Sequence, residues 1–267
     1  MEPLAPVWRQ ATIAPQRAGA TTTARLVLEN GGAATWRSRG EDGLQVSYHW
    51  LDTRGNAIVW DGARTPFPRT VAPGEQVAVD VQLDAPRPPG RYVLRFDLVE
   101  EHRFWLSEVG VETHDVEIDV APLIAVRRLA VVVHGGSDTR TVEALAAQDE
   151  PIVADEPSAT AHLVAGAQPA SEWARLMLDA HAEGWAAVGP ALVPVGGPLE
   201  RRRAARALHR WSPGGRNPRF DGPLLLPSLV VGLEPDEHRG LPAHVGEGLF
   251  EGRATVRLPT RSGRRPT

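Results

Sequence analysis

The sequence predicts a two-domain protein, with an antiparallel all-β sandwich over residues 1–120 and an α/β domain with a mainly parallel sheet over residues 121–267. Two observations support this prediction. In the first part of the chain, apolar and polar residues alternate, as they do in strands with one buried face. In the second part, continuous apolar runs alternate with amphipathic stretches. The runs indicate buried strands and the amphipathic stretches indicate helices, in the alternating order of an α/β domain. A length of 267 residues is compatible with two domains of ordinary size.

Several segments of the first part have the composition and period of β-strands. The clearest is 44–50, where every second residue from Leu44 to Trp50 is apolar and therefore lies on one face. Turn signals such as Asn30-Gly31-Gly32 and Ala72-Pro73-Gly74-Glu75 separate the segments. Short strands at this spacing predict an antiparallel sandwich of about 100 residues. The predicted strands are 24–29, 44–50, 56–60, 77–83, 92–99 and 116–120.

Five of the eight tryptophans lie in this first part. A buried aromatic side chain removes about 150–250 Å² from water, so these residues are candidates for the core. Trp50 lies on an alternating apolar face, and we expect it between the two sheets. Trp36 and Trp60 lie beside turns, where an indole can instead stack against a sugar ring. They are therefore the candidate sugar-stacking residues.

The second part opens with 128–133, a continuous apolar run that predicts a strand buried on both faces. Ser171 can cap a helix from Glu172 to about Glu183, and an apolar stripe from Trp173 to Ala180 predicts which side of this helix packs on the core. Further strands are expected at 151–155, 162–165 and 185–189, and further helices at 141–148 and 200–211.

The sequence of the first part resembles those of the immunoglobulin-like accessory domains of bacterial proteins. The matching segments are Glu29 to Gly32 leading to Thr35-Trp36, Ser47 to Asp52, Ala72 to Glu75, and Pro89 to Val99. The resemblance implies an architecture rather than a reaction. It also implies that the sandwich can bind a protein partner.

In the second part, His134-Gly135-Gly136 follows the first predicted strand, and Asp155-Glu156 follows the next one. With the stretches 173–190 and 246–252, this order resembles an inverting, family-2-type glycosyltransferase of the GT-A type, shortened and degenerate. The resemblance implies that His134, Gly135, Gly136, Asp155 and Glu156 bind a nucleotide sugar. It implies that Glu247 or Glu251 is the catalytic base, and that the protein acts in the biosynthesis of a glycan or cell-surface polysaccharide.

The same family binds a divalent cation through an Asp-x-Asp motif, where this chain has Ala165-Gly166-Ala167-Gln168. A hard cation prefers carboxylate oxygens, so we expect no metal cofactor, and a transferase that is catalytically impaired. The alternative is a non-catalytic module for carbohydrate binding, protein binding or assembly, built on a degenerate transferase fold. His134 and His162 have no second pair at metal-ligand spacing, so no histidine metal site is expected either.

Composition excludes several other functions. The chain has no cysteine and no lysine, which excludes thiol catalysis, cysteine-based zinc sites and Schiff-base chemistry. The net charge of -4 gives no reason to expect nucleic-acid binding. Because no apolar run reaches about 18 residues, no transmembrane segment is expected, and a cytoplasmic location is the default. Five arginines between Arg253 and Arg265 leave peripheral attachment to a membrane open.

Overall fold

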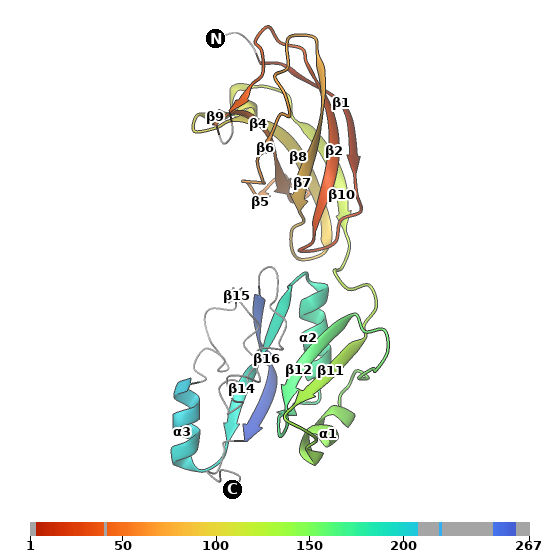
Figure 1. The fold of residues 1–267 in the computed structure, drawn as a ribbon, viewed down its shortest axis with the longest axis vertical. Helices are drawn as coiled ribbons and strands as arrows, with labels where there is room; N and C mark the ends of the chain where they lie inside the picture. The colour runs from red at the N-terminus through yellow and green to blue at the C-terminus, as the bar shows by residue number, and fades with distance from the viewer. Residues whose placement is uncertain (1–3, 40–41, 208–218, 221–247, 260–267) are drawn as a thin grey trace. The chain divides into compact units, whose positions relative to one another are not determined.

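The computed structural model describes residues 4–39, 42–207, 219–220 and 248–259. The chain divides into two compact units, Met1–Leu123 and Ile124–Thr267, which we call the first and the second unit (Figure 1). This boundary lies three residues beyond the predicted one. None of the helices in the described ranges is long and apolar enough to cross a membrane.

The first unit is a sandwich of two antiparallel sheets. One has the strand order β1–β2–β7, and the other has the order β10–β8–β4–β3, with β5 and β6 paired to β4 and β9 paired to β8. The strands of the first sheet are β1 (Pro6–Ile13), β2 (Thr21–Asn30) and β7 (Gln76–Asp84). Those of the second are β3 (Ser38–Arg39), β4 (Asp42–Leu51), β5 (Ala57–Val59), β6 (Thr65–Pro66), β8 (Gly90–Glu100), β9 (Phe104–Trp105) and β10 (His114–Val120), and a short 3₁₀ helix follows β9 (Leu106–Val109).

The long strands follow the immunoglobulin order. In that convention β1, β2 and β7 are strands A, B and E, and β4, β8 and β10 are strands C, F and G. Trp50 on β4 is fully buried, and its Nε1 donates a hydrogen bond to the carbonyl oxygen of Asp84 at 2.9 Å. Tyr92, near the start of β8, donates its hydroxyl hydrogen to the carbonyl oxygen of Pro88 at 2.6 Å, which is the bond of a tyrosine corner. The predicted immunoglobulin-like sandwich is confirmed.

The second unit contains two small sheets in its described part. β11 (Leu129–His134) and β12 (Ala159–Val164) pair in parallel. In the other sheet β16 lies between β13 and β14, parallel to β14 and antiparallel to β13 and β15. Its strands are β13 (Gln168–Pro169), β14 (Ala187–Val195), β15 (Arg219–Phe220) and β16 (Gly248–Pro259), and the helices of the unit are α1 (Thr139–Ala146), α2 (Trp173–Ala182) and α3 (Pro198–Ala207).

Helix α2 carries the core of the second unit. Its predicted apolar stripe is buried, and the four residues of the stripe, Trp173, Leu176, Met177 and Ala180, are each at most 5% exposed. The stripe packs against β14 and β16, whose buried residues include Leu192 and Val256. The predicted helix at 172–183 therefore has the predicted buried face.

The resemblance to a GT-A glycosyltransferase is wrong. Strands make up 48% of the structure and helices 14%, and most strand pairs are antiparallel. In the described ranges of the second unit, β11 and β12 form a small two-stranded parallel sheet, and the sheet of β13 to β16 is mixed, so the mainly parallel α/β sheet that was predicted is not present there. The segment 151–155, predicted as a strand, contributes only a bridge from Ile152 to Leu129. The apolar runs predicted β11, β12 and β14 but not β13, β15 or β16. They also carry no information on pairing, and β16, from a distant part of the chain, pairs between β13 and β14.

Candidate binding site

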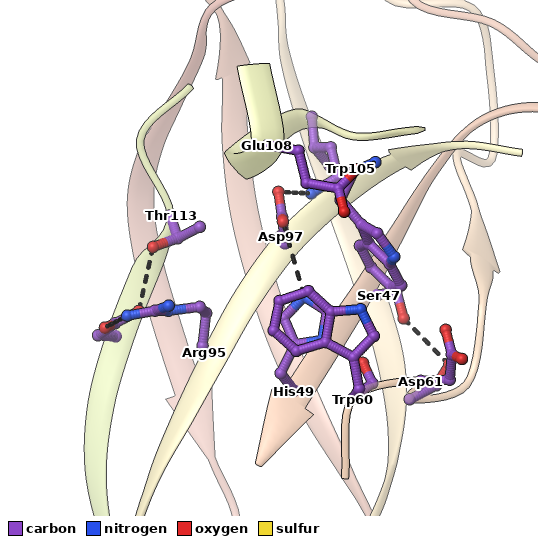
Figure 2. A network of polar contacts seen from close by, with 12 residues as sticks. Ser47, His49, Trp60, Asp61, Arg95, Asp97, Trp105, Glu108 and Thr113 are labelled. Atoms are coloured by element: carbon purple, nitrogen blue, oxygen red, sulfur yellow. Dashed lines mark hydrogen bonds and ion pairs between the residues drawn. The ribbon is translucent and has the colours of Figure 1, made fainter. Parts of the chain in front are cut away.

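Part of the outer face of the second sheet in the first unit, on β4 and the end of β8, is buried, although sheets of this kind commonly leave one face to water. The residues that alternate with the core residues on β4 are each at most 3% exposed, and two outward residues of β8 are at most 4% exposed. These residues are Gln45, Ser47, His49, Leu51, Asp97 and Val99. Segments that follow β5 and β8 cover them, and this covered face forms the candidate site (Figure 2).

Two indoles lie over His49. The ring centroid of Trp60 lies 4.1 Å from that of His49, with 23° between the planes, so the two rings are stacked. Trp105 lies 4.3 Å from His49 in a tilted arrangement, and the two indoles meet edge to face at 6.2 Å. Trp105 is 8% exposed, whereas Trp60 is 41% exposed. One face of Trp60 is therefore supported by the His49 ring (Figure 2). Much of the residue remains open to solvent.

Arg64 joins the two covering segments. Its guanidinium lies 4.7 Å from the centre of the Trp105 ring, within the range of a cation–π contact. It also forms ion pairs with Glu101 at 2.6 Å and with Asp61 at 3.0 Å. Partial burial lowers the pKa of Arg64, but the hydrogen bonds and charges of Glu101 and Asp61 outweigh it, so the pKa is raised above its ordinary value. We call Trp60, Arg64 and Trp105 the aromatic cover.

Beneath the aromatic cover lies a buried pair of titratable groups. The Nε2 atom of His49 is 3.6 Å from Oδ2 of Asp97, and the two side chains are 0% and 2% exposed. The Nδ1 atom of His49 contacts the carbonyl oxygen of Trp60, and Oδ1 of Asp97 accepts a hydrogen bond from the amide of Leu98 at 2.7 Å. The separation of 3.6 Å exceeds hydrogen-bond distance, so Nε2 of His49 and Oδ2 of Asp97 are buried side by side without a hydrogen-bond partner in the described part of the chain.

Ser47, His49 and Asp97 are the residue types of a hydrolase triad, but their contacts are different. The Ser47 hydroxyl donates to the carbonyl oxygen of Gly62 at 3.1 Å, and the His49 nitrogens face Trp60 and Asp97. A serine nucleophile needs a hydrogen bond to the histidine and access to substrate. Here the serine is buried and directed elsewhere, so the group supports the aromatic cover and performs no acyl transfer.

The two predicted sugar-stacking residues lie in different environments. Trp36 is fully buried in the sandwich and stacks on Phe67, with ring centroids 5.3 Å apart. Its ring is therefore part of the core and closed to a ligand. Trp60 is the exposed member of the aromatic cover.

The predicted nucleotide-binding residues do not lie together. His134 is the last residue of β11, and Gly135 and Gly136 follow it at the carboxyl end of the strand. The carbonyl oxygen of Asp155 accepts a hydrogen bond from Arg128 at 2.8 Å, and the Glu156 carboxylate lies 3.4 Å from the same guanidinium, at the opposite end of β11. At about 3.3 Å per residue the two ends of this strand are about 16 Å apart.

Of the two glutamates assigned as catalytic base, Glu247 lies outside the described residues. Glu251 is on β16, and both of its carboxylate oxygens accept hydrogen bonds from Arg253, at 2.8 and 2.7 Å. These bonds outweigh partial burial and lower the pKa of Glu251. A general base is most effective when its pKa lies near the working pH, above the ordinary pKa of a glutamate. The pair with Arg253 lowers the pKa of Glu251 and so makes it a weaker base.

Sequence reasoning missed most of the site. On β4, Ser47 and His49 are the polar positions of an alternating strand, and such positions are expected to face water. Trp105 and Arg64 come from short covering segments with no strand-like period. The one usable signal was the pair of tryptophans beside turns, and only Trp60 proved exposed.

In the described ranges, no group of three or more His, Cys, Asp or Glu side chains is placed to hold a metal ion. The fold and the site together define the class of the first unit: an immunoglobulin-like β-sandwich whose outer sheet face carries a partly exposed aromatic cover.

No protein-family model and no curated protein matches the sequence. Solved structures that resemble the chain include the CARDB domain of a Pyrococcus furiosus protein, with 13% identity over 44% of this chain and 96% of that domain and a TM-score of 0.26. They also include a PapD-like domain of human CEP192, with 17% identity, 43% and 81% coverage and a TM-score of 0.21. A family 123 glycoside hydrolase from Clostridium perfringens is 12% identical, with a TM-score of 0.26. The match covers 43% of this chain and 24% of the hydrolase. Similarities of this size carry no argument about function.

Proposed function

We propose that the first unit is a non-catalytic carbohydrate-binding module in which the Trp60 indole is the platform for a sugar ring. The observation that supports this proposal is the partly exposed indole, 41% open, held flat against a fully buried imidazole. A pyranose ring presents a face of C–H groups that can pack on an indole, and such a contact removes apolar surface from water.

Polar groups beside Trp60 suit the hydroxyl groups of such a ligand. The Asp61 side chain is 69% exposed and follows Trp60 directly in the chain. Arg64, which binds Asp61, is 29% exposed. A carboxylate and a guanidinium offer acceptors and donors in fixed positions, because the ion pair and the stack on His49 already hold the residues. Groups that are ordered before binding lose less conformational entropy on binding.

A second candidate function is protein binding. Ile58 on β5 is 47% exposed and lies two residues before Trp60, which is 41% exposed, so two large apolar side chains are open to solvent within three residues of the chain. Adjacent exposed isoleucine and tryptophan side chains are typical of protein contacts, in which aromatic residues are enriched. This observation favours a partner that touches both side chains.

The carbohydrate proposal is tested with the full chain and a panel of soluble hexose and N-acetylhexosamine oligosaccharides, by titration calorimetry and tryptophan fluorescence. We expect at least one member to bind, and Trp60→Ala to abolish that binding. Val109→Ser is the matched control, because Val109 is 59% exposed on the 3₁₀ helix after β9, outside the aromatic cover. Absence of binding across the panel, or binding that Trp60→Ala leaves unchanged, contradicts the proposal.

A further inference from the structure

We propose that His134 and His162 form a binding site for a divalent transition-metal ion in the second unit. His134 is the last residue of β11, and His162 lies on β12, the parallel neighbour of β11. In the register of this pair His162 lies opposite Val132, two residues before His134. Because side chains alternate along a strand, both imidazoles project from the same face of the two strands.

The geometry of the pair fits a shared ion. The Nε2 atom of His134 lies 3.0 Å from Nδ1 of His162, and the rings are stacked with centroids 5.3 Å apart. Two imidazole nitrogens at the usual distance of about 2.0–2.1 Å from an ion are about 2.9 Å apart in a cis square-planar site and about 3.3 Å apart in a tetrahedral one. The observed separation falls within this interval, so the nitrogens need not move apart, and rotation of both rings toward a common point would let an ion replace the shared hydrogen.

The chemistry of the pair selects the class of ion. Imidazole suits copper, nickel and zinc, whereas magnesium and calcium prefer oxygen ligands. No third His, Cys, Asp or Glu joins the pair among the described residues, so water fills the remaining positions and the site is open. The Irving–Williams order predicts that Cu²⁺ binds more tightly than Ni²⁺ or Zn²⁺.

Sequence spacing could not reveal this site, because the two histidines are 28 residues apart and come together only through the parallel pairing of β11 and β12. The site is independent of the carbohydrate proposal, since it lies in the other unit and uses none of the aromatic cover. It replaces the sequence-based expectation that these two histidines bind no metal.

The test is calorimetric titration of the full chain with Cu²⁺, Zn²⁺ and Mg²⁺ salts, with His134→Gln and His162→Gln as variants. The matched control is His102→Asn, because His102 is exposed in the first unit and asparagine tolerates its backbone φ of 60°. Each variant keeps eight of the nine histidines. We expect Cu²⁺ to bind most tightly and Mg²⁺ not to bind, and each glutamine variant to weaken Cu²⁺ by about tenfold or more, since each loses one of two protein ligands.

Electron paramagnetic resonance of the Cu²⁺ form gives a readout that does not depend on the variants. We expect hyperfine structure from two nitrogen ligands in the unaltered chain, and circular dichroism shows whether each variant is folded. Copper affinity that is unchanged in both glutamine variants overturns the proposal. An equal loss in His102→Asn also overturns it, because the ion is then bound by scattered histidines, and so does a copper spectrum without two equivalent nitrogen ligands.

Discussion

The indole of Trp60 lies flat against the buried imidazole of His49, with ring centroids 4.1 Å apart and 23° between the planes. The same histidine contacts Asp97 on the neighbouring strand and the carbonyl oxygen of Trp60. His49 therefore connects the exposed platform to the sheet beneath it, both through its ring face and through its nitrogens. The position of the platform depends on the buried pair, and this dependence can be tested without any ligand.

We expect Asp97→Asn to destabilise the first unit by about 1–3 kcal/mol, because Asp97 is 2% exposed and the amide group changes a polar contact with His49 that water cannot replace. Asparagine keeps the volume and can still accept the hydrogen bond that the Leu98 amide donates. The measurement is urea unfolding of the full chain followed by tryptophan fluorescence, since five of the eight tryptophans lie in the first unit.

The control for this prediction is Asp115→Asn on β10. Asp115 pairs with Arg95 at 2.6 Å, but the two side chains are 40% and 32% exposed. An ion pair that is this open to water is worth about 0–1 kcal/mol. Similar losses in the two variants would mean that the buried contact between His49 and Asp97 contributes no more to stability than an exposed ion pair.

We expect Arg64→Met to loosen the aromatic cover with little effect on the core of the sandwich. Loss of the ion pairs to Glu101 and Asp61 should lower the free energy of unfolding by about 1 kcal/mol, a value kept small because Arg64 is partly exposed. It should also make Trp105 more accessible, which is measured by quenching of tryptophan fluorescence with acrylamide. Arg25→Met, which removes an exposed pair with Asp80 on the other sheet, should leave quenching unchanged.

The fold of the first unit was largely predictable because its strands carry their own signal. From Leu44 to Trp50 the alternation identified the strand and the face that enters the core. Strand β1 was missed, because its residues are half-buried or exposed and lack a clean alternation. In the second unit the apolar stripe of α2 was sufficient to predict the helix. Pairing order was not predictable, because β16 hydrogen-bonds between β13 and β14, from which it is distant in sequence.

The candidate site was less predictable than the fold. A polar residue such as His49 on the outward face of a strand normally faces water, and only the covering segments make it buried. Asp97 lies about 50 residues further along the chain, and only the antiparallel pairing of β4 and β8 places it beside His49. Trp36 and Trp60 were equivalent as sequence signals, since both stand beside turns. Their difference in exposure arises from tertiary packing, which local sequence does not encode.

We expect Leu178→Ala to destabilise the second unit by about 2–5 kcal/mol, because Leu178 is fully buried on α2 and its truncation leaves a cavity. Leu199→Ala on α3 is the matched control, since Leu199 is 76% exposed and alanine is at least as good a helix former. Thermal unfolding followed by far-UV circular dichroism measures both. A loss in Leu199→Ala as large as that in Leu178→Ala would contradict the assigned core.

We expect the second unit to lose stability as the pH falls below about 6.5, because burial lowers the pKa of His181 in the folded state. Above the ordinary histidine pKa of about 6.5 the ring is neutral in both states and has no effect. As the pH falls through that value, the unfolded chain takes up the proton first, so unfolding becomes more favourable until the folded pKa is reached. His162, whose pKa is also lowered, contributes in the same direction. The measurement is the urea midpoint of the full chain between about pH 5 and about pH 7.5, and His181→Gln should reduce its slope. A midpoint that is constant, or that rises as the pH falls, would show that neither histidine is held neutral by its surroundings.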